Sequence, residues 1–345
     1  MKKQAGALPR LDRKLEWRAG ERLRIVLWWL PILTLLAGFA TAPEVSAPER
    51  KALAYLALEV PLWSKEHKCY SCHNNGDAAR ALFEAMKRPG PFKADVPESA
   101  VADTTKWLSA PDRWDHNGGE GPFSDKVLAR VQFASALASA TKSGLIKTRL
   151  PLDRAAEQLA RDQRADGSWP IEDGENATGS PAAYGGPLAT LSARDTLEYA
   201  DPVRYREYVA KAERRLLSRS IENVMDGSIA LLASAARKDA EVNAIRERAL
   251  KILRVGQSPE GGWGPFINAS PEPFDTALAV LALVRLIPDD DIRDRIKRGR
   301  AFLIATQLAD GSWRETTRPA GAESYAQRLS TTGWATLALL QTSPR

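Results

Sequence analysis

The sequence predicts an all-α protein, an (α/α)6-type toroid of helical hairpins preceded by an N-terminal signal or anchor helix. Three observations predict this fold. A loop pattern, Gln-x-x-(Asp/Glu)-Gly-(Ser/Gly)-Trp, occurs three times after residue 160. Apolar segments of helical length lie on both sides of these loops. Alanine and leucine are abundant, whereas the alternation of apolar and polar residues that is typical of strands is scarce.

The chain of 345 residues is long enough for one large domain or two small ones, each with a buried core. It is 44% hydrophobic and 27% charged, as expected of an ordinary soluble globular protein. The net charge of +6 is concentrated at the N-terminus, where the first 24 residues carry eight Lys or Arg and three Asp or Glu. The rest of the chain is nearly neutral and has no basic stripe with interleaved aromatic residues, so we expect no nucleic-acid partner.

Residues 25–42 form an uncharged apolar run directly after this basic flank. Such a pair of segments is typical of an export signal or a membrane anchor. Because the positive flank stays in the cytoplasm, we expect the remaining chain to be exported, periplasmic or on the extracytoplasmic face of the membrane. The run of 18 residues is near the lower limit for a span, and cleavage sites in it are ambiguous, so a cleaved signal and a retained anchor both stay open. A buried core helix is a third reading, but it would not explain the cations.

The two cysteines of the chain lie together, in the pattern Cys69-x-x-Cys72-His73. This is the spacing of covalent c-type heme attachment. Two thiols about one helical turn apart can each form a thioether with a heme vinyl group, and the adjacent histidine can then ligate the iron. Bacteria attach such hemes outside the cytoplasm, which agrees with the export signal. The sequence therefore predicts heme c as the cofactor, bound through Cys69, Cys72 and His73.

Two other readings of this motif stay open. The thiols of an exported protein can form a Cys69–Cys72 disulfide, or the motif can supply three ligands of a zinc site whose fourth ligand comes from elsewhere. If a heme is bound, its iron needs a sixth ligand or an open position. His116 and Met86 are the two side chains that we consider for that ligand.

Each of the three repeated loops has residue types suited to joining helices. Glycine permits a left-handed turn after a helix end, and Asp, Glu or Ser can bond the free backbone groups of the turn. Glutamine can bridge a helix end to the neighbouring loop, and tryptophan can pack its large flat surface between adjacent units. We expect structural roles for Gln163, Trp169, Gln257, Trp263, Gln307 and Trp313.

The spacing of these loops leaves room for one more unit. The second and third loops are 50 residues apart and the first and second are 94 apart; a degenerate copy, Asp226-Gly227-Ser228, lies between them without its tryptophan. We expect helices at residues 49–58, 78–87 (with Asp77 as its N-cap), 97–109, 124–140, 151–164, 187–199, 202–220, 228–237, 239–256, 275–286, 290–307 and 330–340. Six hairpins of alternating outer and inner helices can close into a ring.

This organisation predicts three regions. Residues 1–42 form the basic tail with the export signal or anchor. Residues 43–95 form the Cys-x-x-Cys-His segment, packed on the toroid. Residues 96–345 form the toroid repeats.

The third loop and the helix before it carry a longer pattern, made of Gly299, Phe302, Leu303, Gln307, Gly311 and Trp313. It fits every fixed position of Gly-x-x-(Phe/Tyr/Trp)-Leu-x-x-x-Gln-x-x-x-Gly-x-Trp, the repeat of the squalene–hopene cyclase and prenyltransferase superfamily, which the chain resembles over about residues 150–345. The resemblance implies an α/α toroid and an apolar, isoprenoid-like ligand. The Cys-x-x-Cys-His element ahead of such repeats resembles a group of bacterial exported proteins that join a heme-type motif to a cyclase-like toroid.

The resemblance also directs attention to one candidate acid. Cyclases of this superfamily protonate a polyprene with the middle aspartate of Asp-x-Asp-Asp-Thr-Ala. The corresponding stretch here begins at Glu272 and ends in Asp275-Thr-Ala, and Phe274 stands at the proton-donor position. Glu272 and Asp275 are the acids that remain for a catalytic role, although Asp275 equally suits the start of a helix. The zinc ligands of the protein prenyltransferases have no counterpart among the repeats.

Three hypotheses about function follow from these features, in descending order of preference. The first is an exported heme c protein with a redox or sensing role and a redox partner. The second is a non-catalytic toroid that binds a ligand without heme. The third is a divergent cyclase-like enzyme acting on an apolar substrate. Whether the chain is an enzyme stays open, because no Ser/His/Asp triad, phosphate loop or paired-carboxylate signature is present.

Overall fold

The computed structural model describes residues 47–87, 91–116, 126–169, 171, 185–235, 237, 239–316 and 324–344. Contacts within the chain separate Met1–Ala42 from a second unit, Pro43–Arg345. The apolar run at residues 25–42 lies outside the described residues. Within the described ranges, no helix is long and apolar enough to cross a membrane.

Two sets of helices alternate along the second unit. One set consists of α1 (Ala47–His67), α4 (Glu98–Leu108), α6 (Leu150–Asp162), α8 (Arg206–Leu217), α10 (Ala240–Gly256) and α12 (Asp290–Thr306). The other consists of α2 (Ala79–Lys87), α5 (Lys126–Lys142), α7 (Gly185–Ala200), α9 (Val224–Ser234), α11 (Pro273–Leu283) and α13 (Tyr325–Thr342). Short helices complete the described set: the π-helix η1 (Cys72–Ala78), α3 (Pro91–Ala94) and the 3-10 helix η2 (Pro111–His116).

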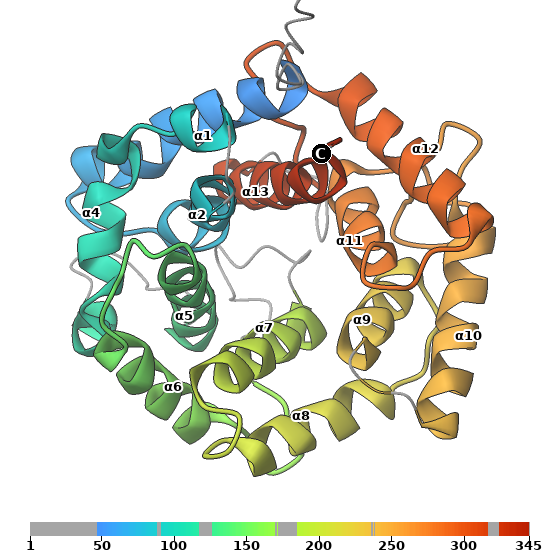
Figure 1. The fold of residues 1–345 in the computed structure, drawn as a ribbon, viewed down its shortest axis with the longest axis horizontal. Coiled ribbons are helices and arrows are strands. Elements are labelled where there is room, and N and C mark those ends of the chain that lie inside the picture. Colours follow the sequence, from blue (N-terminus) through green and yellow to red (C-terminus); the bar gives the residue numbers. More distant parts are fainter. Residues whose placement is uncertain are drawn as a thin grey trace, which may run out of the picture. The chain divides into compact units, whose positions relative to one another are not determined.

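The first set forms an outer ring and the second an inner ring (Figure 1). Each inner helix packs against the next, and α13 contacts both α11 and the pair of η1 and α2, which closes the circle. The expectation of an all-helical α/α toroid is confirmed, because the parts of the chain that the structure describes contain helices and no strand. Leucine and alanine fill the space between the rings, and inner helices such as α11 and α13 are buried along almost their whole length.

The Cys-x-x-Cys-His segment lies within this circle of helices. Outer helix α1 leads through Cys69 into η1, and η1 continues directly into inner helix α2. We expected Asp77 to be the N-cap of a helix at residues 78–87. Instead, Ser71 caps η1, accepting hydrogen bonds from the backbone of His73 and Asn74, and Asp77 is buried inside the helical stretch. The helix begins earlier because the side chain of Asn74 is itself buried and bonded to the carbonyl of Glu59 on α1.

The three repeated loops hold neighbouring hairpins together. Their tryptophans are at most 1% exposed. Each indole N–H donates to a backbone carbonyl of the preceding outer helix; these bonds run from Trp169, Trp263 and Trp313 to Leu159, Leu253 and Leu303 at 2.7–2.8 Å. Each glutamine amide donates to a carbonyl of the next outer helix at 2.9–3.0 Å; these bonds run from Gln163, Gln257 and Gln307 to Tyr208, Arg295 and Pro48.

The third loop therefore joins the last outer helix to the first. Pro48 belongs to α1, so the bond from Gln307 spans the point where the two ends of the helical series meet. A buried ion pair reinforces the same junction: the guanidinium of Arg300 on α12 lies 2.6 Å from the carboxylate of Glu49 on α1, which is fully buried. Arg300 also donates to the carbonyl of Leu339 on α13.

The degenerate copy at Asp226-Gly227-Ser228 is not a loop. These residues form the first turns of α9, with Asn223 as the N-cap whose side chain accepts a hydrogen bond from the backbone of Asp226. Our expectation of a repeat loop here was wrong because a helix start uses the same small polar residues as a turn. Without a tryptophan there is no indole to fix a loop beneath the outer helix.

Candidate functional site

The inner helices enclose a cavity of about 590 Å³. Its walls come from α2, α5, α7, α9, α13 and the C-terminal end of α11 with the residues just after it. On α2 the lining runs from Arg80 to Lys87, and on α13 it runs from Trp334 to Gln341. At about 1.5 Å per helical residue, this wall is about 10 Å deep. Arg80 and Trp334 form the floor, and Lys87 and Gln341 lie near the rim.

Four basic side chains from inner helices α2 and α5 and the segment after α11 line this cavity: Arg80, Lys87, Lys142 and Arg285. They are close enough to influence one another. Burial lowers the pKa of Lys142, and the positive charges of the other three lower it further, against the opposing effect of Asp195. Lys142 also lies 4.2 Å from the ring centre of Tyr199.

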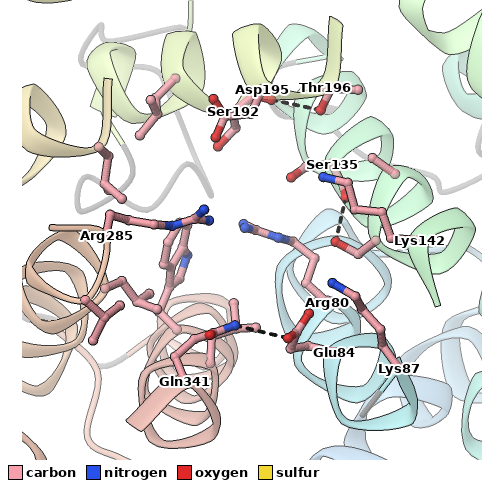
Figure 2. A pocket seen from close by; sticks show the side chains of 18 residues that line it. Arg80, Glu84, Lys87, Ser135, Lys142, Ser192, Asp195, Thr196, Arg285 and Gln341 are labelled. Carbon is pink, nitrogen blue, oxygen red and sulfur yellow. Dashed lines mark hydrogen bonds between the residues drawn. The ribbon is translucent and has the colours of Figure 1, made fainter. Parts of the chain in front are cut away.

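The guanidinium groups of Arg80 and Arg285 point toward each other across the space (Figure 2). The side chain of Arg80 is 17% exposed and lies 4.7 Å above the ring of Trp334. Its Nε and Nη1 atoms are buried and make no hydrogen bond to any residue that the structure describes. Nη1 lies 3.7 Å from the carboxylate of the buried Asp77, while the accessible part of the side chain borders the cavity. A guanidinium at the wall of a cavity can bind an anion through two parallel hydrogen bonds.

Helix dipoles account for only some of these cations. Lys87 and Lys142 lie in the last turns of α2 and α5, where a positive charge interacts favourably with the helix C-terminus. Arg80 lies in the first turn of α2, so this explanation does not apply to it. Arg80 instead forms an ion pair with Asp77, three residues earlier in the chain.

Two acids balance the cations in part. Glu84 accepts a hydrogen bond from Gln341 at 3.0 Å. Asp195 forms an ion pair with Arg194 at 3.2 Å, and about half of its side chain is accessible to solvent within the cavity. Apolar side chains complete the walls: Leu191, Leu232, Leu281, Val284 and Leu337. The site is thus amphipathic, with an excess of positive charge.

A buried polar column lies beneath the cavity floor, one helical turn toward the N-terminal ends of the inner helices. Asp77 is 1% exposed at its centre. Its Oδ2 atom accepts hydrogen bonds from Ser330 at 3.1 Å and from Gln132 at 2.9 Å. Burial raises the pKa of Asp77 to about 6, although the nearby Arg80 and the hydrogen bonds oppose that rise.

The column reaches the heme-type motif at its other end. His73 is 6% exposed, and its Nδ1 atom lies 3.3 Å from Ser330 Oγ. Cys69 and Cys72 are half-buried, with no disulfide between them, and the indole N–H of Trp63 donates to Cys69 Sγ at 3.3 Å. The motif and the cavity are therefore at opposite ends of one set of buried polar contacts.

The other proposed iron ligands are in different environments. His116 is exposed at the end of η2, and Met86 is buried on α2. A heme would need a space beside His73 that is wide enough for the porphyrin, but this imidazole is almost fully buried and the motif does not border the 590 Å³ cavity. Ligation of a heme iron by His73 would require its imidazole to leave this buried contact with Ser330. No group of three or more His, Cys, Asp or Glu side chains in the described ranges is placed to hold a metal ion.

The acids singled out by the family resemblance lie away from the cavity. Glu272 and Asp275 are at the N-terminal end of α11, whereas the cavity is lined by the opposite end of that helix, from Leu281 onward. Asp275 is fully buried and Phe274 is 1% exposed. Leu281 is six positions after Asp275, which is about 9 Å along the helix.

The sequence analysis gave Asp77 a capping role only, and it did not single out Arg80, Lys142 or Arg285. Asp77 and Arg80 are three residues apart, whereas Lys142 and Arg285 come from other parts of the chain that only ring closure brings to the same cavity. One sequence signal was present: an isolated cation at the end of an otherwise apolar helix, as in Lys142 after the alanine-rich stretch of α5.

Comparisons with known proteins agree with the toroid. No protein-family model matches the chain. A curated relative, the drimenyl diphosphate synthase of Streptomyces showdoensis, is 26% identical over 242 residues, which is 70% of this chain but only 36% of that protein. The chain thus spans little more than a third of the relative's length.

Solved structures of terpene cyclases share the fold. A variant of the type II terpene cyclase MstE from Scytonema, in complex with geranylgeranyl dihydroxybenzoate (substrate), has a TM-score of 0.51 and 14% identity, over 86% of this chain and 99% of that one. The ent-copalyl diphosphate synthase from Streptomyces platensis has a TM-score of 0.52 and 18% identity, over 77% of this chain and 50% of that one. At these identities the likeness shows the fold alone: this chain has a cyclase-like α/α toroid.

Proposed function

We propose that the toroid binds an anionic isoprenoid in its central cavity, with the anion held between Arg80 and Arg285. The observation that carries this proposal is the pair of guanidinium groups that face each other across the cavity. Like charges held together in a partly enclosed site are unfavourable unless an anion joins them. Guanidinium groups suit phosphate and carboxylate because they donate two parallel hydrogen bonds.

The size and walls of the cavity support a ligand with an apolar chain. Small-molecule sites commonly have volumes of about 300–1,000 Å³, and this cavity has about 590 Å³. Leucine and valine side chains form an apolar part of the wall, which they share with serine, threonine and acidic side chains. An amphiphile with one charged end matches that division.

The names of the compared proteins support the same ligand class. Drimenyl diphosphate and ent-copalyl diphosphate carry a diphosphate, and geranylgeranyl dihydroxybenzoate carries a carboxylate. All three are isoprenoids with an anionic group. We propose this class of ligand, isoprenoids with an anionic group, for the present chain, and we do not propose any one of these compounds.

Binding is favoured over cyclisation by the positions of the candidate acids. Protonation of a polyprene needs an acid within hydrogen-bond reach of the substrate. Asp275 is fully buried, and neither it nor Glu272 lines the cavity. The toroid shared with terpene cyclases keeps a divergent cyclase as the second candidate.

Export and heme attachment are separate proposals that rest on the sequence. The basic flank and apolar run support an extracytoplasmic toroid that is released or membrane-anchored at residues 25–42. The Cys-x-x-Cys-His spacing supports thioethers at Cys69 and Cys72, and with them a redox partner. The burial of His73 argues against iron ligation in the described arrangement.

Calorimetric titration of the full-length protein with farnesyl diphosphate and with farnesol tests the proposal. The diphosphate should bind and the neutral alcohol should bind at least tenfold more weakly. Replacing either guanidinium, by Arg80→Gln or Arg285→Gln, should weaken diphosphate binding about ten- to hundredfold, because a charge-assisted hydrogen bond is lost.

The matched control is Arg293→Gln. Arg293 is a 57% exposed arginine on outer helix α12, and it does not line the cavity. It should leave the affinity unchanged. Equal affinity for the alcohol and the diphosphate, or full affinity after loss of both inner arginines, would refute the anion site.

A further inference from the structure

Asp77 is placed to sense whether the cavity holds an anion. Its Oδ2 atom is occupied by hydrogen bonds from Ser330 and Gln132. Its Oδ1 atom makes no hydrogen bond to the residues that the structure describes and lies 3.7 Å from Nη1 of Arg80. The same guanidinium points into the cavity (Figure 2). Asp77 and a ligand anion would thus share one cation from opposite sides.

Few other charges act on this carboxylate. Arg80 faces it from α2, and His73 reaches it from η1 through Ser330. The contacts from α5 and α13 come from uncharged side chains, those of Gln132, Ser330 and Trp334. Arg80 is therefore the main positive charge that keeps Asp77 ionised.

We propose that the cavity takes up one proton together with its anionic ligand, and that Asp77 holds this proton; the inference rests on the proposed function. When the anion pairs with Arg80, two negative charges share one guanidinium, and like charges disfavour ionisation of the buried one. A proton from solvent then bonds to Oδ1 of Asp77. For a singly charged anion, the net charge of Asp77 and Arg80, together with the ligand once it is bound, is zero both before and after binding.

The resting state of Asp77 favours this coupling. Burial already raises its pKa to about 6. A nearby anion raises that pKa further, toward neutrality and above. Because this pKa is close to neutral pH, a small further rise changes the fraction of Asp77 that is protonated by a large amount.

Asp195 is the competing candidate, since burial raises its pKa too. It lies on the opposite wall, on α7, and is paired with Arg194 at 3.2 Å. About half of its side chain is accessible to solvent. Solvent screening and its own arginine weaken its coupling to an anion on Arg80.

The test is the pH dependence of binding by the full-length protein. The probe is farnesyl sulfate, whose single charge does not titrate between about pH 5 and pH 9. For the wild type, affinity should rise by up to about tenfold per pH unit as the pH falls from about 8, and should level off below about pH 6, where free Asp77 is already protonated. Calorimetry in two buffers of different ionisation enthalpy should show the uptake of one proton near neutrality.

Variants assign the proton. Asp77→Asn keeps the shape and an acceptor, and it should abolish both the pH dependence and the proton uptake. Ser330→Ala removes a hydrogen bond to the charged form, so it should keep the dependence but move its midpoint to higher pH. Asp195→Asn should keep the dependence, whatever its effect on affinity.

The outcomes separate the two proposals. Absence of binding at every pH would overturn the proposed function and this inference with it. Binding with an unchanged pH dependence in Asp77→Asn, or a dependence lost in Asp195→Asn instead, would overturn the proton site alone. If Asp77→Asn does not fold, the midpoint shift in Ser330→Ala decides, and its absence counts against Asp77.

Discussion

Closure of the ring by the third repeat loop yields a sharp prediction about Gly311. This residue has φ +94°, in the left-handed region, and a Cβ placed on it would lie 2.6 Å from the carbonyl carbon of Lys51 on α1. The obstacle is helix backbone, which cannot rotate away as a side chain would. Gly311→Ala must therefore push the loop off the first outer helix.

The expected cost has three parts. An alanine in the left-handed region costs about 1–2 kcal/mol. Overpacking against α1 costs a further 1–3 kcal/mol, by order of magnitude. Moving the loop also weakens the hydrogen bond from Gln307 to Pro48, worth about 1 kcal/mol. We expect Gly311→Ala to lower the free energy of unfolding by about 3–6 kcal/mol.

Gly144 provides the matched control. Its φ is +79°, yet nothing lies within 4 Å of an added Cβ. Gly144→Ala should therefore cost only the conformational term, about 1–2 kcal/mol. Urea unfolding followed by circular dichroism measures both variants against the wild type. Equal destabilisation of the two variants would contradict a ring that is closed by contact between this loop and α1.

Three further predictions concern the buried tryptophans of the repeat loops, the buried polar column around Asp77 and the heme-type motif. Trp313→Phe should lower the free energy of unfolding by about 2 kcal/mol, measured by urea unfolding, because the carbonyl of Leu303 loses its donor in a buried site. The pKa of Asp77 is raised from 3.8 to about 6 in the folded state, so the folded protein binds this proton more tightly than the unfolded chain does. The free energy of unfolding should therefore fall by about 3 kcal/mol as the pH rises from about 4 to 6. Asp77→Asn should remove that fall in pH-dependent unfolding. A pyridine hemochrome assay on protein produced with the heme c maturation system should show a covalent band that Cys69→Ala abolishes.

Each of these has an opposite result that counts against it. If Trp313→Phe has the same free energy of unfolding as the wild type, the hydrogen bond from the indole N–H does not stabilise the repeat loop. A pH dependence that persists in Asp77→Asn would assign it to another group. Absence of the hemochrome band would leave the cysteines as a dithiol or a disulfide.

The repeat loops were predictable because the sequence repeats them. Gln307 and Trp313 each occur in three equivalent copies, so the pattern could be interpreted without knowing the fold. Glutamine and tryptophan are also large enough that their position in a turn constrains the neighbours. The helix pairing and the ring followed from the spacing of these loops.

The start of α9 and the buried position of Asp77 could not be predicted from a repeated pattern in the sequence. Asp226-Gly227-Ser228 has the composition of a turn, and only the preceding Asn223 marks a helix start. Asp77 resembles an N-cap by its place before an apolar stretch. Its hydrogen-bond partner Ser330 lies 253 residues away, a distance in sequence that no local pattern records.

The cavity was missed for the same reason. A basic residue such as Arg285 at the end of an apolar helix reads locally as a favourable charge at a helix C-terminus. Its relation to Arg80 exists only after the ring closes. The structure therefore moves the most informative site from the heme-type motif to the opposite end of the inner helices.

The most direct test of the proposed anion site is a crystal structure of the full-length protein with farnesyl diphosphate. The account predicts the diphosphate between the guanidinium groups of Arg80 and Arg285, with the farnesyl chain against the leucine side chains of the cavity wall. A diphosphate bound anywhere else, or a farnesyl chain outside the inner ring, would contradict it.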